Sequence, residues 1–190
     1  MEERGNVLAI MSAKGGTGKT STAANLAASL AINFKKKILA VDTNITTASL
    51  GLHFGIDCPK VTIYEVLKKD YPIESSIYEY DDNLHIIPAS LICLDEKENI
   101  SKFTSVADNV RKLVFHYDIL LSKIAKKYDL VILDSAPGFN YESLANFQIA
   151  NGILFITNPD YPALVATAKA VSYAKFVDVP MGGIVLNKVT

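Results

Sequence analysis

The residues of this sequence that are best suited to chemistry stand together in one glycine-rich loop. The loop lies between the apolar run Val7–Met11 and a stretch with helical spacing, and it consists of Ala13-Lys14-Gly15-Gly16-Thr17-Gly18-Lys19-Thr20. Glycines let the backbone turn with its N–H groups pointing inward, and the start of the following helix adds partial positive charge. Such a loop is an anion cradle, and its strand–loop–helix context is the one that a phosphate-binding P-loop requires.

Three polar side chains at this place suit a nucleoside triphosphate and its metal ion. Lys19 is expected to reach the β- and γ-phosphates, and the Thr20 hydroxyl is expected to ligate Mg²⁺ directly. Asp42, at the end of the next apolar run, is expected to hold the water shell of Mg²⁺, with a helix-capping role as the alternative. The loop residues predicted to bind ATP are Lys14, Gly15, Gly16, Thr17, Gly18, Lys19, Thr20 and Ser21. A tight turn without a ligand is the alternative for the loop, and Gly-Lys-Thr in this context disfavours it.

The elements that must position the loop are short apolar runs separated by helical patterns. The runs are Val7–Met11, Ile38–Val41, Leu84–Ile87, Leu130–Leu133, Ile153–Thr157 and Gly183–Leu186. Several of them are apolar at every position, which is typical of strands that are covered on both faces. We therefore predict an α/β fold, with a mainly parallel sheet and helices on both of its faces.

The stretches between these runs have the patterns of helices. An apolar stripe with spacings of three and four residues is formed by Ala23, Leu26, Ala27, Leu30, Ala31 and Phe34. Thr62 and Glu65 have the spacing of a capping box, and the segment Val106–Lys127 is long enough for a crossover helix. We interpret these features as scaffold.

The composition limits the classes of protein that fit. With 190 residues, 49% of them apolar and 21% charged, the chain has the size and mixture of a single packed domain, residues 1–190. A net charge of −1 gives no support for binding to DNA. Cys58 and Cys93 lack the spacing of a metal site or a disulfide framework. Since no apolar run approaches about 18 residues, we expect a cytoplasmic protein.

The phosphate loop also resembles a known signature. Its residues 14–20, Lys-Gly-Gly-Thr-Gly-Lys-Thr, are similar to the deviant Walker A motif of the family that contains MinD, ParA and nitrogenase iron protein. The resemblance covers essentially the whole chain and implies a P-loop NTPase architecture like that of nitrogenase iron protein. It also implies a homodimer that sandwiches ATP, in which Lys14 crosses the interface and touches the partner's phosphates. A surface lysine without a role is the alternative.

Residues 41–52 resemble the switch I segment of this family, with one departure. Family members usually carry an aspartate at the position of Asn44, where it is thought to orient or activate the attacking water. An amide has nearly the same shape, but it cannot take up a proton or add negative charge. The predicted catalytic residues are thus Lys14, Lys19 and Asn44, and we expect slow rather than abolished ATP hydrolysis.

Residues 134–138, Asp-Ser-Ala-Pro-Gly, resemble the family's switch II segment. The resemblance implies that Asp134 binds Mg²⁺ through water, so the predicted metal set is Thr20, Asp42 and Asp134. Gly138 is expected to bring a backbone N–H close to the γ-phosphate, with a simple turn as the alternative.

Two asparagines follow later strands. Asn187 is predicted to contact adenine, because its amide offers a donor and an acceptor and the family's corresponding asparagine has that role. For Asn158, which precedes a proline, an ordinary turn is a sufficient explanation.

The resemblance favours an ATP-dependent dimerising switch of MinD type, which positions a partner protein in cell division or polarity. ParA proteins usually continue switch I with Pro-Gln-Gly after the second aspartate, whereas residues 45–52 are more similar to MinD. A ParA-type partitioning ATPase is the alternative. An iron–sulfur carrier would need paired cysteines for a shared cluster, and a small-molecule kinase has no obvious use for Lys14.

Members of this family usually continue beyond the position of Asn187 with another strand and further helices. We therefore expect the chain to be truncated at its C-terminal end. The amphipathic membrane-targeting helix of MinD lies at its C-terminus, so attachment to the inner face of the cell membrane through a missing helix stays open.

Overall fold

The computed structural model describes residues 6–45, 47–69, 71–89, 117, 121, 123–139 and 141–189, and it shows one sheet among them. The strands are β1 Val7–Met11, β2 Ile38–Asp42, β3 Tyr78–Asp81, β4 Leu84–Ile87, β5 Leu130–Asp134, β6 Gly152–Thr157 and β7 Met181–Leu186. Their order across the sheet is β3-β4-β2-β5-β1-β6-β7. Every neighbouring pair is parallel except β3 and β4. The predicted α/β class with a mainly parallel sheet is confirmed.

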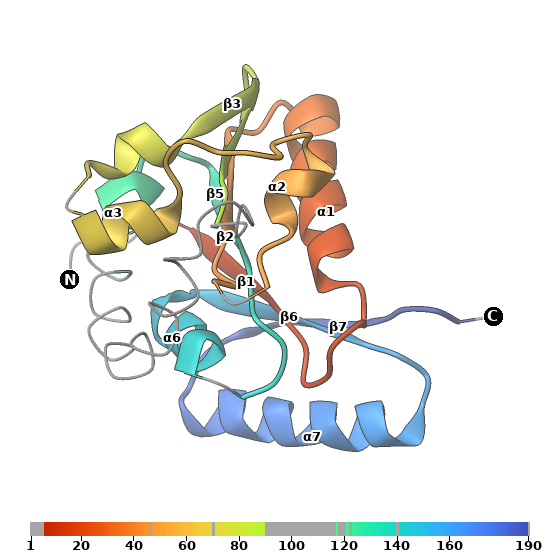
Figure 1. Cartoon of the computed structure of the whole chain (residues 1–190). Helices are drawn as coiled ribbons and strands as arrows, with labels where there is room; N and C mark the ends of the chain where they lie inside the picture. Colours follow the sequence, from red (N-terminus) through yellow and green to blue (C-terminus); the bar gives the residue numbers. More distant parts are fainter. Residues whose placement is uncertain are drawn as a thin grey trace.

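Helices cover both faces of this sheet (Figure 1). They are α1 Lys19–Phe34, α2 Leu50–His53, α3 Ile63–Lys69, α6 Tyr141–Ile149 and α7 Tyr161–Phe176, with a short 3₁₀ turn η1 Ile73–Ser76 after α3. α1 and the start of α2 pack on one face, and α3, α6 and α7 pack on the other. This is the two-sided arrangement that runs of wholly apolar strand residues require.

The strand residues alternate between two separate apolar clusters. In β1, Ala9 and Met11 belong to the cluster under α6 and α7, whereas Ile10 belongs to the cluster under α1. α1 contributes small side chains to its cluster, and Ala23 and Ala27 are fully buried there. Small residues let the helix that follows the phosphate loop lie close to the sheet, which fixes the height of the loop above the strand ends.

The two edge strands of the sheet, β7 and β3, differ from the prediction. Gly183–Leu186 is predicted as a buried strand, but Ile184 and Leu186 of β7 are 56% and 48% exposed. β7 is the last strand of the sheet and pairs only with β6 within the described part of the chain. β3 is missing from the prediction because its sequence, Tyr-Glu-Tyr-Asp, has no apolar run and its side chains are mostly exposed.

The helix predictions are confirmed in part. The apolar stripe of α1 is buried at its alanines, but Phe34 is 65% exposed, because it is the last helical residue before Lys35 turns into the left-handed region at φ 52°. The capping box is present, since the Glu65 carboxylate accepts from the Thr62 backbone N–H at 2.9 Å. The predicted helix Val106–Lys127 lies mostly outside the described residues, as does Cys93; residues 123–125 are helical. Among the described helices, none is long and apolar enough to span a bilayer.

Candidate nucleotide site

The carboxyl ends of the parallel strands meet at one edge of the sheet. The registers pair Ile10 with Asp134 and Asp42 with Asp134, so the ends of β1, β2 and β5 are adjacent. On the other side of β1, the ends of β6 and β7 pair at Thr157 and Leu186. Ligands of open α/β sheets bind at this edge. The fold therefore brings the phosphate loop, both predicted metal aspartates and Asn187 to one place.

The phosphate loop has the conformation that an anion cradle needs. Gly16 and Gly18 have φ of 73° and 96°, in the left-handed region that favours glycine. Gly18 is the N-cap of α1, and no side chain caps the helix there. The first-turn N–H groups are therefore available to an anion. The buried hydroxyl oxygen of Thr17 also has no hydrogen-bond partner among the described residues.

Asn187 lies against the phosphate loop. Its Nδ2 donates to the Thr17 carbonyl oxygen at 2.8 Å, and its backbone N–H donates to the Thr157 carbonyl at 2.8 Å. A Cβ added to Gly18 would overlap with Nδ2 of Asn187, so this close approach requires the glycine. Asn187 thus belongs to the site, where it braces the loop, and its contact with adenine stays a prediction.

Lys19 and Thr20, the two loop residues with the most direct predicted roles, lie close to Asp134. Lys19 is 7% exposed, and burial lowers the pKa of its ammonium group, while the Asp134 carboxylate opposes this shift. A buried ammonium of this kind gains from the arrival of phosphate charge. The Thr20 hydroxyl lies 3.2 Å from the Ser49 hydroxyl, at the start of α2. Ser21, by contrast, is exposed, with its hydroxyl 3.4 Å from Nε2 of His53.

Asp42 holds the switch I segment, residues 41–52, in its present shape. Its Oδ1 accepts from the backbone N–H of Asn44 at 3.0 Å, and its Oδ2 accepts from those of Ser49 and Leu50 at 2.9 and 3.0 Å. Burial raises the pKa of Asp42 to about 7, the Asp134 carboxylate adds to this, and the three N–H groups oppose it. Asp42 therefore organises the loop between β2 and α2 in addition to its predicted metal role.

Asp134 is the group that fits a metal ion best. It is fully buried, and neither carboxylate oxygen has a well-aligned hydrogen-bond partner within the described residues. Burial raises its pKa to about 6, partly offset by the nearby Thr20 hydroxyl and Lys19 ammonium. No cluster of three or more His, Cys, Asp or Glu side chains occurs in that part of the chain. The oxygen donors present, the Asp134 carboxylate and the nearby Thr20 hydroxyl, suit Mg²⁺, which keeps several waters and takes other oxygens from phosphates.

Asn44 is engaged with its own loop. Its Nδ2 donates to the carbonyl oxygen and to the hydroxyl of Thr47, both at 2.9 Å. Its Oδ1 accepts from the Thr47 backbone N–H at 3.2 Å. The side chain is 7% exposed and closes a local turn. Its predicted role toward water stays a prediction, because that role requires these contacts to rearrange.

The switch II segment, residues 134–138, is tied to the phosphate loop. The Gly138 N–H donates to the Ser12 carbonyl oxygen at 2.9 Å, and Gly138 has φ of 80°. The Ser12 hydroxyl donates to the Lys14 carbonyl oxygen at 2.6 Å. The N–H that is predicted to meet the γ-phosphate is therefore occupied, and it must leave Ser12 to do so.

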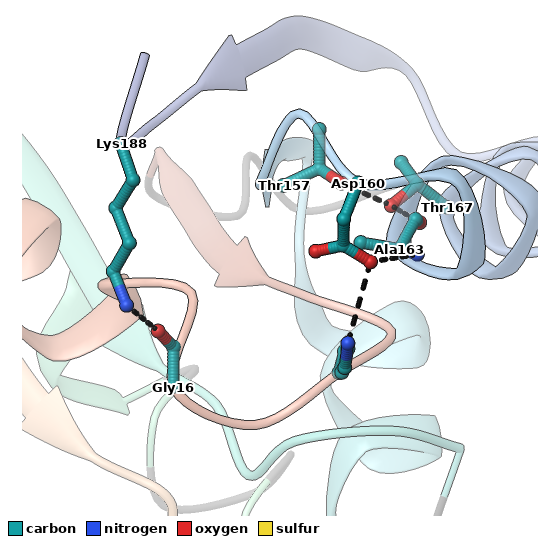
Figure 2. A network of polar contacts seen from close by, with 7 residues as sticks. Gly16, Thr157, Asp160, Ala163, Thr167 and Lys188 are labelled. Carbon is teal, nitrogen blue, oxygen red and sulfur yellow. Dashed lines mark hydrogen bonds and ion pairs between the residues drawn. The ribbon is translucent and has the colours of Figure 1, made fainter. Parts of the chain in front are cut away.

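One ion pair and one hydrogen bond hold the outer side of the phosphate loop (Figure 2). Lys14 Nζ lies 3.3 Å from Oδ1 of Asp160, the N-cap residue of α7. The same carboxylate oxygen accepts from the Ala163 N–H at 2.9 Å, and this contact lowers the pKa of Asp160, with a smaller effect of Lys14. Lys188 Nζ donates to the Gly16 carbonyl oxygen at 2.7 Å.

Asp160 and Lys188 are absent from the predicted site. A signal for Asp160 exists, because an aspartate followed two residues later by Pro162 at the start of a helical pattern is an N-cap signature. That signature predicts a cap, not a contact with Lys14. Lys188 follows Asn187 directly, but its partner Gly16 is distant in the sequence, so the contact depends on the sheet register.

The relatives of this sequence include proteins that are named as ATP-binding. A family model described as "AAA domain" matches residues 5–178. An ATP-binding protein of Methanocaldococcus jannaschii is 30% identical over 183 residues, which cover 96% of this chain and 64% of that protein. The chain therefore spans somewhat less than two thirds of this relative's length.

Solved structures with the same fold include cell division ATPases. The MinD of Pyrococcus furiosus superimposes with a TM-score of 0.80 at 29% identity, covering 96% of this chain and 71% of that one. The septum site-determining protein MinD of Pyrococcus horikoshii, solved with Mg-ADP, gives 0.78 at 27% identity, covering 95% and 69%. The bound Mg-ADP supports ATP and Mg²⁺ as the cofactors of this family. Together with the family match and the phosphate-loop geometry, these likenesses show that the chain belongs to the MinD/ParA family of P-loop ATPases.

Proposed function

We propose that this protein is a cytoplasmic ATP-dependent switch of MinD type, which dimerises around ATP, hydrolyses it slowly and positions a partner protein in cell division or polarity. The observation that carries the proposal is the contrast between the two lysines of the phosphate loop. Lys19 is buried inside its own site, whereas the Lys14 side chain is 52% exposed beside it. A cation that points out of its own site is available to the phosphates of a second copy.

The site residues divide the work of holding and polarising the phosphates. The backbone N–H groups of the loop and Lys19 would bind the phosphate oxygens, and Thr20 would supply a direct oxygen to the metal. Asp42 and Asp134 would hold its water shell. Mg²⁺ bound there would neutralise charge on the phosphate oxygens. Lys14 of a second copy would add positive charge where it develops in the transition state.

Slow hydrolysis is part of the proposal because of Asn44. Its amide is neutral, and it donates hydrogen bonds to the carbonyl oxygen and the hydroxyl of Thr47. A water-positioning role requires the switch I segment to rearrange, and an amide accepts no proton after that rearrangement. Turnover should therefore be low even in a correctly assembled dimer.

The MinD-type role is favoured over DNA partitioning by two observations. Residues 45–52 are more similar to MinD than to ParA in switch I, and the net charge of −1 supplies no general attraction to DNA. ATP-dependent binding to DNA at moderate salt would favour the partitioning role instead.

The proposal is tested by the kinetics of ATP hydrolysis. We expect Lys14→Ala to lower kcat by about 10³-fold, as loss of an arginine finger does, while ATP still binds. Lys36→Ala, which removes an exposed lysine beyond the end of α1, is the control and should leave kcat unchanged. If Lys14→Ala hydrolyses ATP as fast as the original protein, Lys14 has no catalytic role. Phosphate transfer from ATP to a small-molecule acceptor would indicate a kinase instead.

A further inference from the structure

A buried amide connects the two switch segments. Nδ2 of Asn146, on α6, donates to the Thr43 hydroxyl at 2.9 Å and to the Ser135 hydroxyl at 2.7 Å. Asn146 is 1% exposed, Thr43 2% and Ser135 1%. Thr43 is the first residue after β2 and Ser135 the first after β5, so each hydroxyl stands next to one of the predicted metal aspartates.

The direction of the hydrogen bond between Asn146 and Thr43 is fixed by the other contact of the Thr43 hydroxyl. The Thr43 hydroxyl donates to the Asp134 carbonyl oxygen at 2.8 Å, so it can meet Asn146 only as an acceptor. Its backbone N–H donates to the same carbonyl at 3.0 Å. The primary amide of Asn146 has two N–H groups, one for each hydroxyl. A carboxylate at this position could not donate to the Thr43 hydroxyl, because it has no N–H.

The helix that carries Asn146 also contacts switch II and α7 through aromatic rings. Phe147 stacks on Phe139, just after the switch II segment, with ring centroids 6.3 Å apart and planes at 9°. It also meets Tyr173 of α7 edge to face at 5.0 Å. α7 begins at the residue that follows Asp160, the partner of Lys14. α6 therefore lies between the two switch segments and the helix whose N-terminus holds Lys14.

We propose that Asn146 is a positioning residue that makes both switch segments move as one unit with α6. A shift of Thr43 or Ser135 when nucleotide binds would pull on the same amide, so neither segment can change position alone. This inference rests on the proposed function, because it needs ATP as the signal. It assigns to one side chain the coupling between the metal aspartates and the helical layer on that face of the sheet.

The test is hydrogen–deuterium exchange of the protein with and without Mg-ATP, at saturation for each variant. In the original protein, we expect Mg-ATP to slow exchange in the phosphate loop, in both switch segments and in α6. In Asn146→Ala, the phosphate loop should still be protected, but the protection of α6 by Mg-ATP should be lost. Gln148→Ala, which removes an exposed amide from the same helix, should behave as the original protein.

A second variant covers the case in which Asn146→Ala does not fold. Ser135→Ala deletes one acceptor and leaves the Asn146–Thr43 contact in place, so the protection of α6 by Mg-ATP should be reduced in this variant but not lost. If either folded variant keeps the full Mg-ATP protection of α6, the inference is wrong. It is also wrong if the original protein binds ATP without any protection of α6, although the proposed function then stands. Absence of ATP binding to the original protein would overturn the proposed function, and the inference with it.

Discussion

Asn44 occupies the position in switch I where most relatives are expected to carry a carboxylate. In this protein its amide makes reciprocal hydrogen bonds with Thr47, which a carboxylate could make only in part, because it has no N–H to donate. The amide therefore holds the loop more firmly than a carboxylate would, and we expect it to be the weaker catalytic group. A single variant at position 44 should therefore change kcat and the free energy of unfolding in opposite directions.

Asn44→Asp should raise kcat for ATP hydrolysis by about 100-fold, because a positioned carboxylate contributes general-base catalysis. It should also lower the free energy of unfolding by about 1 kcal/mol, since the donor to the Thr47 carbonyl is lost. Steady-state turnover and urea unfolding measure the two effects. Asn44→Ala is the matched control, which should lose stability without gaining speed. Equal kcat values for the two variants would show that position 44 has no catalytic role.

Asp42 should make the stability of the protein depend on pH. Its pKa is raised to about 7 in the fold, against about 3.9 in an unfolded chain. Between these values the folded state keeps a proton that the unfolded state has lost, so this stabilisation is present below about pH 4 and is lost as the pH rises to about 7. Without Mg²⁺, the free energy of unfolding should therefore fall across this range.

Urea unfolding at a series of pH values measures this effect. Asp42→Asn cannot titrate at this position, so its free energy of unfolding should fall less steeply between about pH 4 and 7 than that of the original protein. Parallel curves for the two proteins would contradict the buried, proton-holding state of Asp42.

The phosphate loop depends on a close approach between Gly18 and Asn187, which lie far apart in the sequence. Gly18 has φ of 96°, and a Cβ there would overlap with Asn187 beyond the end of β7. Gly18→Ala should lower the free energy of unfolding by at least about 2 kcal/mol, from backbone strain and from this clash. Gly15→Ala is the control, because a Cβ at Gly15 meets no atom within 4 Å. Thermal unfolding of both variants checks the prediction, and equal midpoints would contradict it.

The contact between the phosphate loop and α7 should oppose dimer formation. Lys14 must leave Asp160 before it can reach the phosphates of a second copy. Asp160→Asn keeps an oxygen that can accept from the Ala163 N–H, but it removes the charge that holds Lys14. We expect this variant to dimerise with ATP a few fold more tightly, since an exposed ion pair is weak. Sedimentation over a range of concentrations measures it, and a weaker dimer would show that Asp160 assists assembly.

The strands were predictable because their residues carry the signal locally. Val7–Met11 and Leu84–Ile87 have the predicted bounds, since each run is apolar except at His85 and is followed by a serine or a proline. β3 could not be predicted, because an exposed edge strand needs no apolar pattern. The exposure of β7 depends on what lies beside it, which its own residues do not encode.

The positions of Asp42 and Asp134 at strand ends and of Lys19 after the glycine-rich loop could be predicted from the sequence, and their roles toward Mg²⁺ and ATP stay predictions. The contacts that hold these residues in place could not be predicted from the sequence. Asn146 meets Thr43 across 103 residues of sequence, and Lys188 meets Gly16 across 172. Such pairs follow from the strand order and register of the whole sheet, and neither can be derived from local spacing.

In the proposed function, the whole protein is one half of an ATP-dependent assembly. In this proposal the buried Lys19 binds the phosphates of its own site, and the exposed Lys14 leaves Asp160 to reach those of a second copy. The switch segments, α6 and α7 form a continuous set of contacts from the predicted metal aspartates to the neighbourhood of Lys14. Loss of the γ-phosphate should therefore alter the same surface that a second copy contacts.

The most direct test of this claim is the molar mass in solution with Mg²⁺ and a non-hydrolysed ATP analogue, compared with Mg-ADP, by light scattering after size exclusion. We expect the mass of two chains with the ATP analogue and of one chain with ADP. Lys14→Ala should remain at the mass of one chain under both conditions. One chain with either nucleotide, with binding of both verified, would contradict the dimeric switch and leave a P-loop protein that binds nucleotide without assembling.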